Sequence, residues 1–358
     1  MQVEIGNIWK GYSVEGLKIQ ETDAVFHNVR KAPFKIYGLV DPMNTYHRVP
    51  MDIAKTISGD VAYHGKATTG VRVRFNTDSK YVGIRAKFAH HVLPNPHITR
   101  LNETGFDIYV EKDGEDVYKG SYYPPKDGFD GYEGIKHFKD NKMRCITIYF
   151  PIGNEVLDLE VALEPNAKIE EPNPYKFEKP VVFYGSSITH GFAAGRPGTT
   201  YVNRIGRMLK TDIMNFGFSG SAKGEANMAK FLAELDMSVC VMDYDYNAPS
   251  VEHLINTHYN FYEIIRKAHP DLPIIFITKP DAGGYTTEFD LARKDVIMKN
   301  YLTARENGDK KVYFIDGNSF FIGGDRMDYT VDGCHPNDAG AKRMADCIGA
   351  VVGELLNK

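Results

Sequence analysis

The stretch Val-Val-Phe-Tyr-Gly-Ser-Ser-Ile-Thr-His-Gly at residues 181–191 decides the fold of this chain. Its first four residues are apolar without alternation, which is typical of a strand buried on both faces, as in a parallel sheet. The turn Gly185-Ser186-Ser187 then ends the strand and leads into a helical segment. A strand, a tight turn and a helix form the start of a βαβ unit, so the sequence predicts an α/β domain that begins here.

The same alternation of strand and helix continues to the end of the chain. A helical period of about 3.6 runs from Val251 to Ile265, and the last helix is expected to begin near Asn337 or Asp338, either of which can cap it, and to run to about Leu356. Parallel strands need crossover helices, so residues 181–358 are predicted to form a three-layer α/β domain around a five-stranded parallel sheet. The expected strands are VVFY (181–184), DIMNF (212–216), SVCVMDY (238–244), PIIFIT (273–278) and KVYFID (311–316).

The first half of the chain has a different period. Val71, Val73 and Phe75 alternate with Arg72 and Arg74, which is the pattern of strands buried on one face. Several such strands with turn signals between them predict an all-β sandwich or jelly roll over residues 1–165. Residues 166–180 are proline-rich, and we expect a stiff linker there. The other alternating stripes are Val82 to Phe88, Ile146 to Phe150, Leu157 to Leu163, and Ile108 and Val110 before the hairpin turn Asp113-Gly114.

The composition excludes several classes of partner. With 358 residues, 42% of them hydrophobic and 25% charged, the chain is expected to form two globular domains. The net charge of −4 comes without a basic stripe, so neither a nucleic acid nor an acidic membrane is an expected partner. Neither a signal peptide nor a run of about 18 apolar residues is found. Together with four sparse cysteines this predicts a cytoplasmic protein, although secretion after processing and a homo-oligomer both stay open.

Polar residues gather where the predicted strands end. Ser187 follows the first strand, Gly220 and Asn247 follow the second and third, and Asp332 and His335 follow the fifth. Each has a simple structural explanation as a turn, a cap or a surface residue. The carboxyl ends of parallel strands meet at one edge of the sheet, however, and reactive groups collect there. We therefore expect these five residues to form one site.

The order of these motifs resembles the SGNH (GDSL-type) hydrolase superfamily. The chain has Gly-x-Ser-x-Thr from Gly185, Asn-x-Gly-x-Ser-Gly from Asn215, a lone Asn247, and Asp-x-x-His-Pro from Asp332. The resemblance implies a flavodoxin-like α/β domain. In the first half, Gly105-Phe106-Asp107-Ile108-Tyr109 is similar to the Gly-x-Asp-Leu-Tyr motif of a branch with an N-terminal β-sandwich.

The resemblance also implies a role for each site residue. Ser187 would be the nucleophile, His335 its general base and Asp332 the orienter of that base. The oxyanion hole would consist of the backbone N–H groups of Ser187 and Gly220 and the side chain of Asn247. No cofactor and no metal enter this scheme. Two positions depart from the family pattern: Ser186 replaces an aspartate, and Tyr246-Asn247-Ala248 replaces Gly-x-Asn-Asp.

These roles predict a carboxylic ester hydrolase that works through an acyl-Ser187 intermediate. Short acyl esters, above all acetyl esters on a carbohydrate, are the expected substrates, so the partner would be a small-molecule or oligosaccharide ester. A lysophospholipase, a thioesterase or an esterase of a small metabolite is the alternative within the enzymes. A non-catalytic glycan-binding protein on a hydrolase fold is the alternative from another class.

Other residues invite a function that the pattern does not decide. His90, His91 and His97 are close enough in sequence for a metal site, but they lack a helical register. His190 has two open interpretations, as a substrate contact or as a solvent-facing loop residue. Asp281 follows the fourth strand, where capping competes with a role in the site. Tyrosines of the first half, among them Tyr37, Tyr46 and Tyr63, are candidates for stacking on sugar rings.

Overall fold

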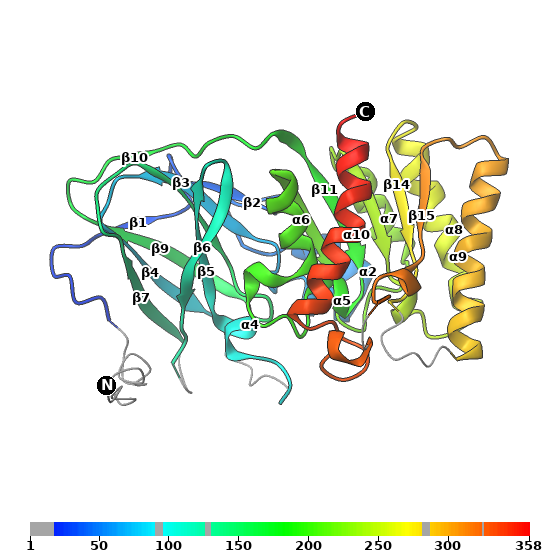
Figure 1. The fold of residues 1–358 in the computed structure, drawn as a ribbon. Coiled ribbons are helices and arrows are strands. Elements are labelled where there is room, and N and C mark those ends of the chain that lie inside the picture. Colours follow the sequence, from blue (N-terminus) through cyan, green and yellow to red (C-terminus); the bar gives the residue numbers. More distant parts are fainter. Residues whose placement is uncertain (1–17, 90–95, 126–129, 281–286, 324–325) are drawn as a thin grey trace.

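The protein consists of a β-sandwich domain and an α/β domain that lie side by side (Figure 1). The computed structural model describes residues 18–89, 96–125, 130–280, 287–323 and 326–358. Within these ranges, none of the helices has the length and apolar character that a membrane crossing requires. Asp281, His90 and His91 lie outside the described residues.

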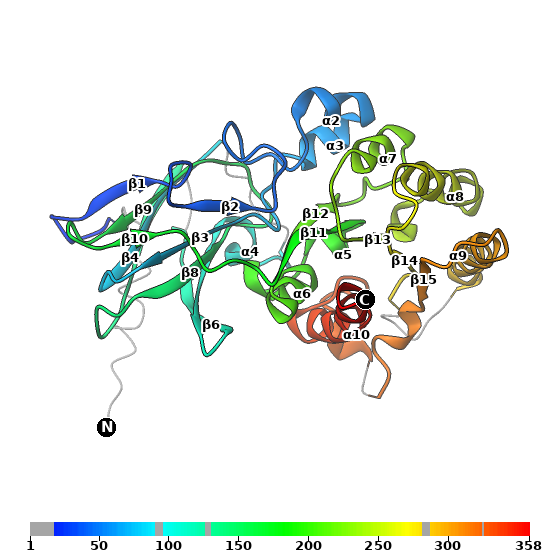
Figure 2. The ribbon, with the colours of Figure 1, turned by 90° about the horizontal axis from the view of Figure 1, so that it is seen from above.

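The α/β domain has the predicted three layers. Its parallel sheet has the strand order β12-β11-β13-β14-β15. Helices α7, α8 and α9 cover one face, and α6 and α10 cover the other (Figure 2). The prediction of a five-stranded parallel sheet is therefore confirmed. The elements are β11 (Phe177–Gly185), α6 (Tyr201–Leu209), β12 (Thr211–Gly217), α7 (Ala226–Ala233), β13 (Val239–Asp243), α8 (Val251–Ala268), β14 (Ile274–Ile277), α9 (Glu288–Glu306), β15 (Val312–Ile315) and α10 (Asp338–Leu356).

The expected linker contains one short strand and the start of another. A short strand, β10 (Ile169–Glu170), pairs with β3, and β11 begins at Phe177 rather than after Pro180. The pairing of β11 with β12 shifts register between Phe177 and Val181, where Pro180 lies. Proline has no N–H to donate, so a strand tolerates it at such an irregularity. The proline-rich segment therefore enters the sheet earlier than its composition predicts.

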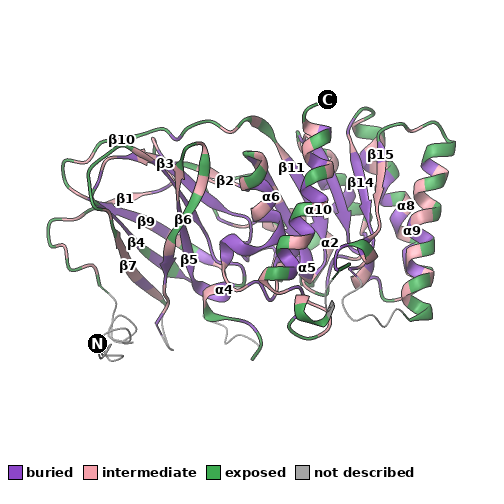
Figure 3. Ribbon diagram, viewed as in Figure 1, coloured by how far each residue is buried: buried purple, intermediate pink, exposed green. Residues whose placement is uncertain are grey.

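The first half folds into two antiparallel sheets, as predicted. One has the order β1-β9-β4-β7, and the other has the order β10-β3-β8-β5-β6 with β2 paired to β3. Their apolar faces enclose a common core, visible as the buried interior at the left of Figure 3. Asp113 and Gly114 have φ values of 52° and 79°, so they form the predicted hairpin turn. The strands are β1 (Val25–Asn28), β2 (Lys35–Tyr37), β3 (Arg72–Thr77), β4 (Tyr81–Phe88), β5 (Phe106–Lys112), β6 (Glu115–Tyr122), β7 (Gly131–His137), β8 (Arg144–Tyr149) and β9 (Val156–Leu163).

Strand β3 is buried on both faces, contrary to its period-two pattern. Arg72 and Arg74 are only 1% and 3% exposed. Arg72 donates to the Oδ1 of Asp212 at 2.5 Å and to the hydroxyl of Tyr175 at 2.7 Å. Arg74 donates to the carbonyl of Asn173 at 2.8 Å. The arginines face the α/β domain and the segment before it, so this alternation separates two buried environments rather than core from solvent.

Two short helices in the first half do not belong to the sandwich. The sequence predicts an all-β fold over residues 1–165, yet α2 (Met51–Ile57) and α3 (Gly59–His64) are helices that lie beside α7 (Figure 2). The buried Ala54 and Val61 are part of the core that α7 and α8 form with the parallel sheet. The N-terminal half therefore completes the core of the C-terminal domain.

Candidate active site

The turn between β11 and α5 (Ser187–His190) presents Ser187. A side chain at Gly185 would collide with Thr189 and with the carbonyl of Asp243, so only glycine fits this close approach. Ser186 is buried and caps α5, because its hydroxyl accepts the N–H of Ile188 at 3.2 Å. An aspartate can fill the same N-cap position, which accounts for the departure from the family pattern. The turn thus directs Ser186 inward and leaves Ser187 partly exposed.

Ser187, His335 and Asp332 form a continuous chain of hydrogen bonds. The Ser187 Oγ lies 2.9 Å from the His335 Nε2, and the His335 Nδ1 lies 2.6 Å from the Asp332 Oδ2. The second oxygen of Asp332 accepts the backbone N–H groups of Cys334 and His335 at 3.0 and 2.7 Å. The structure therefore joins the three residues in the geometry that a serine nucleophile, a base and an orienting carboxylate need.

The environment of Asp332 keeps this carboxylate ionised. Partial burial alone would raise its pKa, but the hydrogen bonds from His335 and Cys334 outweigh burial and hold the pKa below its ordinary value. An ionised Asp332 favours the tautomer in which the His335 Nδ1 carries the proton. The His335 Nε2 is then free to accept a proton from Ser187.

The turns after β12 and β13 face each other. Gly220 is exposed and has a φ of +68°, and a side chain there would meet no atom within 4 Å, so its surroundings are open. Asn247 ends the short helix η3 (Asp245–Asn247), and its Nδ2 donates to the carbonyl of Phe218 at 3.0 Å. A side-chain amide has two N–H groups, so this bond leaves the second one for another acceptor. The N–H of Phe218 donates to the Gly185 carbonyl at 2.9 Å, which ties the β12 turn to the end of β11.

A buried carboxyl supports the turn that carries Ser187. Asp243, the last residue of β13, accepts the hydroxyl groups of Thr189 and Tyr201, both at 3.0 Å. Its carbonyl also accepts the N–H of Ser186 at 3.1 Å. Burial is the main cause that raises the pKa of Asp243 to about 8. Asp243 is not among the site residues predicted from the sequence, although its position at the end of a predicted strand was a signal for such a role.

His190 has neither of the two positions expected of it. It is buried, its Nε2 lies 3.1 Å from the carbonyl of Ile152, and its ring contacts His64 edge-on at 5.9 Å. Burial lowers its pKa well below the ordinary value, so the ring stays neutral. The sandwich domain covers the end of α5, which is why His190 reaches neither solvent nor substrate.

His97 brings the sandwich domain to the rim of the site. Its Nε2 lies 3.7 Å from the Asp332 Oδ2, and its ring lies 6.3 Å from that of His335 and 5.9 Å from that of Phe192. In the described part of the chain, His97, Asp332 and His335 bring potential metal-ligand atoms within 4.8 Å of one another. This set suits a cation such as Zn²⁺ chemically. The 2.6 Å bond between His335 and Asp332 already accounts for their proximity.

The three candidate tyrosines lie in different environments. Tyr46 is buried against Phe150 at a ring distance of 4.9 Å, so it cannot stack on a sugar. Tyr37 packs edge-on against Tyr175 at 4.8 Å. Tyr63 is 62% exposed, so stacking stays a prediction for this residue.

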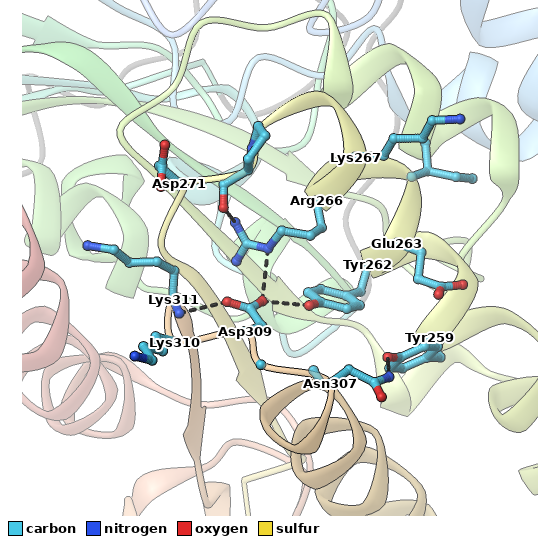
Figure 4. Close-up of a pocket in the computed structure, with 14 residues that line it drawn as sticks. Tyr259, Tyr262, Glu263, Arg266, Lys267, Asp271, Asn307, Asp309, Lys310 and Lys311 are labelled. Atoms are coloured by element: carbon cyan, nitrogen blue, oxygen red, sulfur yellow. Dashed lines mark hydrogen bonds and ion pairs between the residues drawn. The ribbon is translucent and has the colours of Figure 1, made fainter.

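A large cavity lies at the other edge of the parallel sheet. It has a volume of about 870 Å³ and is lined by the ends of α8 and α9 and the segment before β15 (Figure 4). Its central polar groups pair with one another: Asp309 accepts the hydroxyl of Tyr262 at 2.5 Å and the Nε of Arg266 at 2.8 Å. The central polar groups of the cavity therefore satisfy one another.

Known proteins match both halves of the chain. The GDSL-like lipase/acylhydrolase family matches residues 178–353, and the family described as the N-terminus of Esterase_SGNH_hydro-type matches residues 24–169. No curated protein matches the chain.

Solved structures share the complete two-domain arrangement. A protein from Bacteroides ovatus named as a GDSL-like lipase is 27% identical, with a TM-score of 0.85 over 93% of this chain and 98% of that chain. The salicylyl-acyltransferase SsfX3 from a tetracycline biosynthetic pathway is 19% identical, with a TM-score of 0.77 over 94% and 99% of the two chains. The acetyl xylan esterase Est2A from Butyrivibrio proteoclasticus is 12% identical, with a TM-score of 0.58 over 93% and 99%.

The fold and the family matches define a carboxylic ester hydrolase of the SGNH type. Within that class, the chain belongs to the two-domain branch whose N-terminal β-sandwich carries the GxDLY motif.

Proposed function

We propose that the protein removes a short acyl group, most often acetyl, from a carbohydrate ester. The observation that carries the proposal is the hydrogen-bonded chain from Ser187 through His335 to Asp332. The choice of acetyl esters on a carbohydrate rests on the likeness to Est2A, which is named as an acetyl xylan esterase.

In this proposal the reaction proceeds in two steps. The Ser187 Oγ attacks the ester carbonyl while the His335 Nε2 takes its proton, and His335 then passes that proton to the leaving alcohol. A water molecule, deprotonated by His335, attacks the acyl-serine, and the proton returns to the Ser187 Oγ as the acid leaves. In both steps the negative charge on the carbonyl oxygen would be stabilised by the N–H groups of Ser187 and Gly220 and the amide of Asn247.

Hydrolysis of 4-nitrophenyl acetate, butyrate and octanoate, and acetate release from acetylated oligosaccharides, test the proposal. Ser187→Ala should lower kcat by roughly a thousandfold or more. Ser186→Ala is the matched control: it removes the neighbouring hydroxyl and an N-cap, so we expect a loss of about 1 kcal/mol in stability and a small change in kcat.

Three results would contradict the proposal. Equal activity of the wild type and Ser187→Ala would exclude Ser187 as the nucleophile. Octanoate cleaved as readily as acetate would exclude the short-acyl preference. Glycan binding without turnover of any ester would favour a binding protein instead.

One observation favours a second candidate, an esterase of small metabolites with apolar groups. Met327 and Val331 are 49% and 41% exposed on the loop that carries Asp332 and His335. Exposed apolar side chains beside a site favour apolar substrates. Faster release of acetate from aryl acetates than from acetylated sugars, at equal substrate concentrations, would support this candidate.

A further inference from the structure

Arg48 is a fully buried cation that the β-sandwich half contributes to the α/β domain. It is 0% exposed and directly precedes the segment that forms α2. Its Nη1 donates to the carbonyl groups of Asn215 and Gly217 at 2.8 and 2.7 Å. Its Nε and Nη2 donate to the carbonyl groups of Ala67 and His64 at 2.7 and 2.6 Å. One guanidinium thus connects the segment at the end of α3 to the end of β12.

The hydrogen-bond acceptors of Arg48 are all neutral. Across the described ranges, no carboxylate forms an ion pair with it. The other deeply buried interdomain arginine, Arg72, pairs with Asp212. Burial lowers the pKa of Arg48 to about 9, so it still carries its charge at neutral pH. A buried charge without a counter-ion is costly, so a role that offsets this cost is expected.

The two β12 carbonyls lie just before the turn that carries Gly220, one of the three expected donors of the oxyanion hole. Phe218 follows Gly217, and its ring lies 5.0 Å from the Arg48 guanidinium. The Phe218 N–H donates to the Gly185 carbonyl, and the Phe218 carbonyl accepts the Nδ2 of Asn247. A side chain at Gly217 would collide with the backbone of Thr189 and His190, so this strand end also touches α5. Arg48 therefore binds the end of β12, which contacts the Ser187 turn, the Gly220 turn and Asn247.

We propose that Arg48 is a positioning residue for the oxyanion hole: it fixes the end of β12 so that the Gly220 N–H and the Asn247 amide converge with the Ser187 N–H. Its positive charge also lies at the carboxyl edge of the sheet, where negative charge would develop on the carbonyl oxygen of the substrate. The β-sandwich half would then take part in turnover itself, beyond any contact with the substrate. This inference rests on the proposed function, since it takes Ser187 as the nucleophile.

Arg48→Met and Arg48→Lys test this role, and Arg72→Met is the matched control. Arg72 is buried at the same interface and donates to the Ile213 carbonyl in the middle of β12, away from the turn. For Arg48→Met we expect kcat for 4-nitrophenyl acetate to fall roughly 10- to 100-fold, less than after loss of a direct oxyanion donor, with KM within about threefold. Arg48→Lys, which keeps the charge but has a shorter reach, should recover part of the loss. Arg72→Met should keep kcat within about threefold at a similar drop in Tm.

The inhibition constant Ki of methylboronic acid is a measurement that a purely structural role of Arg48 would leave unchanged. The boron adds to the Ser187 Oγ as the serine proton passes to His335, and one hydroxyl of the tetrahedral adduct occupies the oxyanion hole. Its Ki should rise in parallel with the loss of kcat in the Arg48 variants and stay unchanged in Arg72→Met. Wild-type kcat and Ki in a folded Arg48→Met would overturn the inference, as would equal losses in Arg72→Met. If Arg48→Met does not fold, Arg48→Lys against Arg72→Met decides by the same criteria. Activity that survives in Ser187→Ala would instead overturn the proposed function.

Discussion

The two edges of the parallel sheet use polar residues in opposite ways. At the amino edge, Asp309, Arg266 and Tyr262 satisfy one another around a cavity of about 870 Å³. At the carboxyl edge, Ser187, His335 and Asp332 form an open-ended chain that finishes in a partly exposed hydroxyl. The two edges therefore differ in how far their polar groups satisfy one another. The candidate active site is marked by a chain of hydrogen-bonded polar groups that ends in the partly exposed hydroxyl of Ser187.

The strongest way to break the comparison is to disable the orienter of the base. Asp332→Asn keeps the shape of the turn, but its amide favours the wrong tautomer of His335. We expect kcat to fall by about 10⁴-fold with KM little changed. Steady-state hydrolysis of 4-nitrophenyl acetate measures this effect. The double variant with Ser187→Ala should be no slower than Ser187→Ala alone, and additive losses would contradict a shared role.

A smaller loss is expected at the oxyanion side. Asn247→Ala removes an amide that already holds the β12 turn through the Phe218 carbonyl. We expect a fall in kcat of about 10²–10³-fold, the usual effect of losing one such donor. Asn247→Asp keeps the size but removes both N–H groups, and should be no better than alanine. Near wild-type kcat in both variants would exclude Asn247 from the oxyanion hole.

Asp243 should show that a buried carboxyl at the carboxyl edge lowers the free energy of unfolding. Its pKa of about 8 lies above the ordinary value of 3.8, so the unfolded chain releases this proton first as the pH rises. Asp243 therefore lowers stability progressively between about pH 4 and pH 8. Relative to wild type, Asp243→Asn should gain about 4 kcal/mol in unfolding free energy between pH 5 and pH 8, at about 1.4 kcal/mol per pH unit, and no more above pH 8. Urea unfolding across this range measures the gain, and a pH-independent difference would contradict the raised pKa.

Asp309 at the amino edge should instead stabilise the fold and have little effect on the reaction. Asp309→Ala leaves the mostly buried Arg266 and the hydroxyl of Tyr262 without their shared acceptor. We expect a loss of about 1–2 kcal/mol in stability and a kcat within twofold of wild type. Thermal unfolding and ester hydrolysis on the same samples test both statements. A large fall in kcat would mean that this cavity takes part in the reaction.

The sequence predicts best those features whose causes are local. The central strands β13 and β14 are buried throughout, and β11 is buried from Val181 onward, so their apolar runs are easy to recognise. Asn337 caps α10 as expected, because a cap depends on a few neighbouring residues. Ser187, His335 and Asp332 could be grouped because the ends of parallel strands must share an edge. Their catalytic roles stay predictions, which the variants above test.

Features caused by distant residues could not be predicted. Arg72 looks like a solvent-facing residue, and its partner Asp212 lies 140 positions away. The same holds for His190, whose covering residue Ile152 comes from the other half of the chain. Helices α2 and α3 are short, and their apolar positions gain a partner only when α7 lies beside them. The residues next to these helices in the sequence give no indication of such a partner.

The placement of α2 and α3 has a consequence for how this protein could be divided or recombined. The chain looks modular in sequence, with a junction near residue 170 that would tempt anyone designing a truncated enzyme or a chimaera. A cut there would remove Ala54 and Val61 from the interior to which they belong and leave an apolar hole beside α7. The two halves should therefore melt in a single transition, and the sandwich cannot be exchanged as a cassette unless these two helices stay behind.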